Sequence, residues 1–122
     1  MRVLLAVCIA VALGGIASAK EHAVSRGAGA VSCALYAKAY QMNPDQIDDL
    51  FFNWALGFMS AVNVITGTMD GTSRDLAAKT QNEMKRYFRQ YCNDHPLEDY
   101  ATGVMELMGS LPTFKPTLKS ND

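Results

Sequence analysis

The sequence predicts an all-α fold: a small four-helix domain with one disulfide, preceded by a cleavable signal peptide. Three observations lead to this prediction. Apolar residues recur at three- and four-residue steps through most of the chain. Proline follows a capping residue at two places that divide these apolar patterns, as expected for helix starts. Two cysteines remain once the leader is removed.

The first 19 residues have the pattern of a secretory signal peptide. Arg2 supplies a positive charge, residues 3–12 are apolar, and Ala-Ser-Ala at 17–19 forms a cleavage site. The apolar run is shorter than the roughly 20 residues that a membrane-spanning helix needs. No later segment is judged apolar enough to span a membrane, so we expect no membrane insertion after cleavage. The sequence thus predicts a periplasmic or secreted protein that begins at Lys20.

Cys33 and Cys92 are the two cysteines of the exported chain. An even pair in a small exported domain is most simply a disulfide, whereas free or metal-bound thiols are the minority alternatives. No CxxC or CxxCH motif occurs. A bridge of this span would contribute roughly 4 kcal/mol in the chain-entropy treatment.

The domain is expected to occupy residues 31–112, between a flexible segment at 20–30 and a disordered tail at 113–122. Ser32 caps a first helix that reaches about Met42, and Asn43-Pro44 starts a second. The second helix should end near Gly67. Its predicted inner face comprises Ile47, Phe51, Trp54, Phe58, Ala61, Val62 and Ile65.

A third helix is predicted from the turn at Asp70-Gly71 and the start signal at Thr72 to about Cys92. A fourth follows Pro96 and ends at Gly109 and Pro112. The predicted inward residues of these two helices are Ala77, Met84, Phe88, Tyr91, Cys92, Leu97, Tyr100, Ala101, Val104, Met105 and Met108. No stretch has the two-residue period of a strand.

Charged residues are assigned to helix ends. Asp45, Asp48 and Asp49 complement the dipole at the start of the second helix. Lys85, Arg86 and Arg89 are expected to complement the end of the third. Without an EF-hand pattern, the aspartates do not predict a metal site.

Composition and motifs argue against several classes of function. The formal net charge is −1, and non-specific nucleic-acid binding needs a basic surface. No phosphate-binding loop, nucleophile elbow, HExxH or dinucleotide fingerprint occurs. Asp94-His95 lacks a nearby nucleophile and is assigned to a helix cap. We therefore expect no enzymatic activity, catalytic residue, cofactor, bound metal or nucleic-acid partner.

A protein-binding surface is the remaining candidate site. Asn53, Ser60 and Asn63 fall close to one face of the second helix, beside Gly57. An ordinary exposed face is the alternative for these residues. Trp54 and Phe58 are either core residues or part of a partner groove. The sequence also leaves a homodimer open.

Three segments occur in order along the chain: Ser-Cys-Ala-Leu-Tyr at 32–36, Phe-Asn-Trp-Ala-Leu-Gly-Phe at 52–58, and Tyr-Cys-Asn-Asp-His-Pro at 91–96. Together they resemble the HdeA/HdeB family of periplasmic acid-stress chaperones. The resemblance covers about residues 31–108 and implies a small helical protein crosslinked by one disulfide. Cys33 and Cys92 match the family's bridging pair. The implied function is the protection or binding of other proteins, with unfolded clients as partners.

A second resemblance rests on residues 54–63, His-Pro-Leu-Glu at 95–98, and Leu-Pro at 111–112. These segments are similar to the Tai-type immunity proteins, which are periplasmic helical inhibitors of cell-wall amidases delivered by type VI secretion. The resemblance implies a folded protein partner in place of unfolded clients.

The HdeA-like function suggests a mechanism driven by charge. Below about pH 3 most carboxylates are protonated, because their usual pKa values lie near 4. The exported chain would then carry about +13 from its bases, histidines and amino terminus. Self-repulsion would loosen the fold while the disulfide limits its expansion, which would free the inner face of the second helix.

Overall fold

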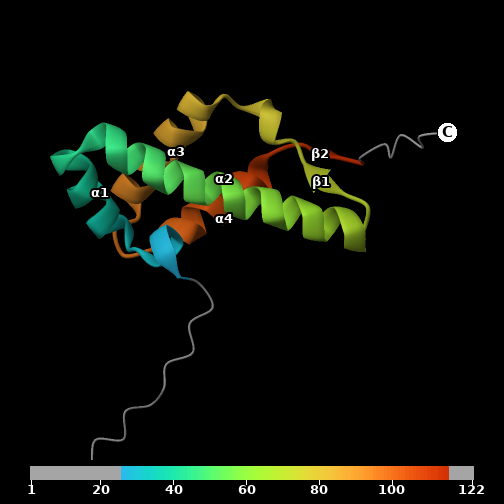
Figure 1. The fold of residues 1–122 in the computed structure, drawn as a ribbon, viewed down its shortest axis with the longest axis horizontal. Coiled ribbons are helices and arrows are strands. Elements are labelled where there is room, and N and C mark those ends of the chain that lie inside the picture. Colours follow the sequence, from blue (N-terminus) through green and yellow to red (C-terminus); the bar gives the residue numbers. More distant parts are fainter. Residues whose placement is uncertain (1–25, 116–122) are drawn as a thin grey trace, which may run out of the picture.

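The computed structural model describes residues 26–115 (Figure 1). Four α-helices make up most of this part: α1 (Cys33–Met42), α2 (Pro44–Met69), α3 (Gln81–Asp94) and α4 (Tyr100–Ser110). The short elements are 3-10 helices η1 (Gly27–Ala30) and η2 (Leu76–Ala78), and strands β1 (Ser73–Arg74) and β2 (Thr113–Phe114). The predicted all-α, four-helix domain is confirmed. The signal peptide, residues 20–25 and the tail beyond residue 115 lie outside the described residues.

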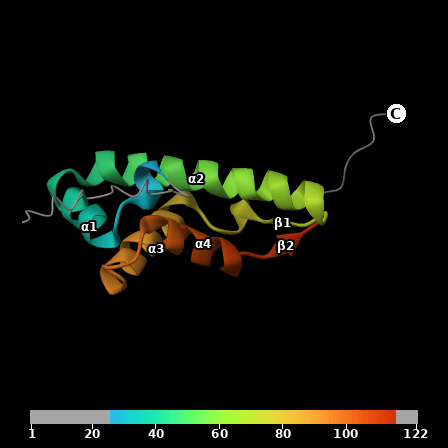
Figure 2. The same cartoon turned by 90° about the horizontal axis from the view of Figure 1, so that it is seen from below.

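The long helix α2 forms one layer of the molecule by itself. Figure 2 shows α3 and α4 side by side beneath it, with α1 at one end and the two strands at the other. The last turns of α2 extend past α3 and α4 and are accompanied there by β1 and β2. One side of α2 therefore faces the rest of the domain, and the opposite side has no described neighbour.

Aromatic rings fill the centre of the domain. The ring of Tyr36 lies 4.8 Å from that of Phe51 and 5.1 Å from that of Tyr100, between centroids. Tyr100 in turn lies 5.3 Å from Phe88, so rings from all four helices meet. Aromatic contacts of this kind add about 0.5–1.5 kcal/mol each beyond the area they bury.

The disulfide between Cys33 and Cys92 is present, with the two Cα atoms 4.5 Å apart. It joins the first residue of α1 to the last turn of α3 across 59 residues of chain. Both cysteines are buried within the core. The predicted link between the first helix and the end of the third is thus confirmed.

The prediction of a flexible segment does not hold for residues 27–30. They form η1, and Gly29 is buried directly under the indole of Trp54, where a Cβ atom would overlap the ring. The next residues are held as well, since Tyr100 N–H donates to the Val31 carbonyl at 2.9 Å. The folded domain therefore begins before residue 31.

The buried face of α2 overlaps the predicted one only in part. Phe51 is buried as predicted, and four other predicted residues are half-buried against the core: Ile47, Trp54, Phe58 and Val62. Ala61 and Ile65 are exposed, and the buried face extends instead to Phe52, Ala55 and Met59, roughly 100° further round the helix. The helix also continues through Gly67 to Met69. Gly71, at φ 72°, then turns the chain in a conformation that favours glycine.

The third helix starts later than predicted. Thr80 and Glu83 form a capping box at its first turn, with Thr80 N–H donating to the Glu83 carboxylate at 2.7 Å. Upstream of it, β1 pairs antiparallel with β2, so the prediction of no strand is wrong here. Ala77 lies exposed in η2 and not on an inner helix face. The predicted disordered tail is likewise wrong for Thr113 and Phe114, which form β2.

The fourth helix also starts later than predicted. Leu97 precedes it and is 94% exposed, because the chain after Pro96 first turns back to bond to α1: Cys33 N–H donates to the Glu98 carbonyl at 2.7 Å. Met105 lies on the outer side of α4 and is 53% exposed. Tyr100, Val104 and Met108 are buried as predicted.

By length and composition, α2 is apolar enough to cross a membrane, so the prediction that no such segment follows the leader is wrong on that criterion. Only 22% of its most apolar stretch is buried in the domain. Residues 50–69 contain no Asp, Glu, Lys or Arg. An uncharged helix that stays this exposed needs an explanation from function.

Candidate functional site

Three of the predicted contact residues share the outer face of α2. Asn53, Gly57 and Ser60 are all exposed, and nothing lies within 4 Å of the position of a Cβ at Gly57. Asn63 does not belong with them. Its side-chain amide donates to the Arg74 carbonyl and accepts from the Arg74 N–H, both at 2.8 Å, so it fixes β1 against α2.

The exposed face continues along α2 in both directions. We call it the outer strip and define it by six exposed residues: Leu50, Asn53, Gly57, Ser60, Ala61 and Val64. It lies opposite the buried row at Ala55 and Met59, as the 100° step of the helix requires. Leu50 is 57% exposed and Val64 67% exposed, so the strip is apolar at both ends.

Trp54 and Phe58 flank the outer strip on one side. Their rings stack, with centroids 5.4 Å apart, and both side chains are half-buried. Phe58 packs against the core, as one of the two predictions had it, and it also lines a groove. The role of that groove in binding a partner stays a prediction.

That groove, of about 350 Å³, runs between α2, α4 and the strands. We call it the methionine groove, because Met105 and Met108 form its α4 side opposite Phe58 and Val62. Arg74 closes one end. Its Nη1 donates to the carbonyls of Gly109 and Leu111 at 3.0 and 2.9 Å, which fixes the C-terminus of α4 against β1.

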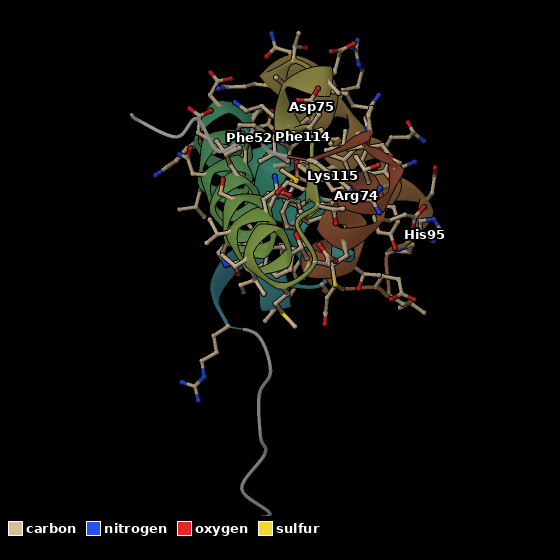
Figure 3. All side chains as sticks on the ribbon, turned by 90° about the vertical axis from the view of Figure 1, so that its right-hand side faces the viewer. Phe52, Arg74, Asp75, His95, Phe114 and Lys115 are labelled. Carbon is tan, nitrogen blue, oxygen red and sulfur yellow. A yellow bond between two sulfur atoms is a disulfide. The ribbon has the colours of Figure 1, made fainter. Side chains whose placement is uncertain are left out.

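Figure 3 views the molecule from the end that carries the strands. Arg74, Phe114 and Lys115 lie in this end, whereas His95 lies apart from them. His95 stacks on Tyr91 at 4.5 Å at the end of α3, where its backbone N–H donates to the Tyr91 carbonyl. Within residues 26–115 no three His, Cys, Asp or Glu side chains gather as metal ligands would. The prediction that the protein is not an enzyme stays a prediction.

The two charge clusters of the sequence face each other across α2 and α3. Asp48 pairs with Arg89, and the Asp49 carboxylate lies 2.5 Å from the Lys85 ammonium. The pocket between the helices is also lined by Asp45. Lys85 and Arg89 therefore bind α2, whereas Arg86 lines the pocket without an ion pair to α2. The last turn of α3 contains no basic residue, so the prediction that this cluster complements it is wrong.

Asp48 also reaches the aromatic core, where it accepts a hydrogen bond from the Tyr36 hydroxyl at 3.1 Å. Burial, and after it the charge of Asp48, raises the pKa of Tyr36 well above its ordinary value. Burial likewise raises the pKa of the Tyr100 phenol. The folded protein therefore keeps both protons at a pH where the unfolded chain loses them.

This linkage predicts a loss of stability in alkali. The stabilisation from Tyr36 and Tyr100 is fully present below the unfolded pKa of about 10 and falls as the pH rises beyond it. We expect urea midpoints that drop between pH 10 and 11.5, and a shallower drop in the double variant Tyr36→Phe, Tyr100→Phe. An equal drop in wild type and variant would contradict the assignment.

Comparison with known proteins assigns no family. The chain matches no family model, no curated protein and no solved structure. The function is therefore argued from the surfaces described above.

Proposed function

We propose that this is a small exported, non-enzymatic protein of the HdeA-like kind, which binds or protects other proteins through the methionine groove. The observation that carries the proposal is the apolar side of this groove, formed by Phe58, Val62, Met105 and Met108, which is open to solvent beside a polar lining that includes Arg74. Met105, at its edge, is 53% exposed. Exposed apolar side chains gathered in a groove are typical of binding surfaces.

Methionine suits a surface that must accept varied partners. Its side chain is unbranched and polarisable, so it adjusts to different apolar groups. Phe58 supplies a flat ring opposite, held in place by its stack on Trp54. An apolar segment of an unfolded client could therefore bind without a fixed sequence.

Ion pairs of Asp48 with Arg89 and of Asp49 with Lys85 hold α2 on α3. The self-repulsion expected of the chain in strong acid would have to break these contacts before α2 separates from α3. The disulfide would keep α1 and α3 together as α2 separates. Apolar residues on the inner face of α2 would then add to the methionine groove.

A client-protection assay tests the proposal. At about pH 2.5 the protein should suppress light scattering by an aggregation-prone client, and dye binding should report newly exposed apolar surface. Met105→Lys should reduce this protection severalfold, because it places a charge at the rim of the groove. The matched control is Leu97→Lys, since Leu97 is 94% exposed and lies outside the groove. No protection by the wild type, or equal effects of the two substitutions, would reject the proposal.

The immunity function is the second candidate, and the outer strip favours it. An inhibitor of a folded enzyme needs a surface that already exists at neutral pH, and Asn53, Gly57 and Ser60 form one. Tyr100 is only 1% exposed and cannot supply an aromatic anchor, so Trp54 and Phe58 are the nearest aromatic candidates. Inhibition of a cell-wall amidase at neutral pH, lost in Ser60→Arg without loss of thermal stability, would support this function over the chaperone.

A further inference from the structure

We propose that the outer strip of α2 binds the outer strip of a second copy of this chain, in an antiparallel helix pair centred on Gly57. The proposal concerns a different surface from the methionine groove and does not depend on client binding. It explains why an uncharged helix face stays exposed in a chain that contains 23 charged residues (11 basic and 12 acidic).

The strip is self-complementary about Gly57. Leu50 and Val64 lie seven residues to either side of it, and Asn53 and Ala61 lie four to either side. In an antiparallel pair centred on Gly57, Leu50 therefore meets Val64 of the partner subunit. Asn53 likewise meets Ala61 of the partner subunit. Leu50 and Val64 thus meet at the two ends, Gly57 meets its own copy at the centre, and Ser60 lies opposite Trp54 of the partner subunit.

Steps of three and four residues keep these positions on one side of α2. Residues 50, 53, 57, 60 and 64 follow a seven-residue repeat, which is the spacing of helices packed along their length. Gly57 sits at the centre with open space above it, so two backbones can approach closely there. The spacing and the glycine thus favour a helix as the partner.

Charge does not oppose the pairing. Residues 50–69 carry none, and the charged Asp49 lies just beyond the end of the strip, paired with Lys85. No ion would be buried, so no desolvation penalty of that kind arises. Antiparallel helices also place opposite ends of their dipoles together. A second copy meets all of these conditions without any change of conformation.

The size of the strip limits how strong the pairing can be. The strip spans residues 50–64, about 22 Å of helix that is about 10 Å wide, so the contact covers roughly 220 Å² per subunit. The total of roughly 450 Å² is well below the 1,200 Å² of stable complexes. We therefore expect a weak dimer that exchanges with monomer.

Sedimentation equilibrium at pH 7, from about 10 µM to 1 mM, should show a concentration-dependent rise from monomer toward dimer. Gly57→Arg should weaken the association at least tenfold, because it places two charged side chains at the centre. It should leave the melting temperature nearly unchanged, since this position is open. Leu97→Arg, an equal change at another exposed site, should dimerise as the wild type does. A wild type that stays monomeric at 1 mM overturns the proposal, even if it binds lipid vesicles.

Oxidative crosslinking in a Cys8→Ser background tests the register. Gly57→Cys should form a covalent dimer by itself, because the residue lies on the two-fold axis. Leu50→Cys and Val64→Cys should crosslink when mixed, and much less when each is alone. Crosslinking of each alone as efficiently as the mixture would reject the antiparallel register.

Discussion

Replacing Cys33 and Cys92 together by alanine should lower the melting temperature by roughly 15–30 °C. The bridge closes 59 residues of chain, which corresponds to roughly 4 kcal/mol of stability. For a domain of this size, each kcal/mol shifts the melting temperature by about 4–8 °C. Calorimetry or circular dichroism of the exported protein at neutral pH measures the shift.

A reductant separates the bridge from the packing of the two side chains. Both cysteines are buried, so alanine also removes some core volume. Dithiothreitol should therefore reproduce most of the shift in the wild type and cause none in the double variant. The bridge would be absent from the exported protein if alkylation without prior reduction labelled both cysteines.

The sequence predicts those parts of the fold that short-range chemistry decides. Ser32 starts α1, with its hydroxyl accepting from the Leu35 N–H at 3.4 Å, and Pro44 opens α2. The bridge was predicted from the expectation of export, because an oxidising compartment favours a disulfide. None of these depends on how the helices pack against one another.

The inner face of α2 could be predicted only in part, because residues 50–69 contain no charge that would mark the side facing water. Trp54 and Phe58 compete with Ala55 and Met59 for the core, and periodicity alone does not choose between them. In the structure η1 covers the ring of Trp54, and Ala55 and Met59 occupy the core positions.

The start of α3 was predicted too early for a different reason. The prediction rested on the turn at Asp70-Gly71 and on Thr72 to Asp75, which have the spacing of a helix start. Thr80 to Glu83 has the same spacing and was overlooked. In the structure, β1 takes part of the segment from Thr72 to Asp75 by pairing with β2, a contact from the other end of the chain.

The α2–α3 ion pairs were missed although both clusters were noticed. Each was assigned to the dipole of its own helix, because sequence gives no distance between residues 41 positions apart. A signal for the ion pairs was present in the sequence. Asp45 and Asp48 are three residues apart, and the oppositely charged Lys85 and Arg89 are four residues apart, so each pair lies on one side of its helix. Such a match indicates two helices that lie side by side.

Replacing Asp48 by alanine should cost about 2–3 kcal/mol, whereas the same change at Asp49 should cost less than about 1 kcal/mol. The two aspartates are adjacent in sequence and each pairs with a base of α3. Their side chains differ in exposure, at 15% for Asp48 and 68% for Asp49. Exposed pairs contribute about 0–1 kcal/mol, whereas breaking a shielded pair costs several times more.

The larger cost at Asp48 comes from the partners that the substitution leaves behind. The Arg89 guanidinium loses its carboxylate, and the Tyr36 hydroxyl loses its acceptor within the core.

Urea unfolding at pH 7 gives the free-energy costs of Asp48→Ala and Asp49→Ala. The cost of Asp48→Asn should fall between these two values, because asparagine still accepts a hydrogen bond. In the double variant Asp48→Ala, Tyr36→Phe the cost should be less than the sum of the single costs, since neither hydroxyl nor carboxylate is left unpaired. Equal costs at Asp48 and Asp49 would mean that Asp48 does not join the α2–α3 contact to the aromatic core.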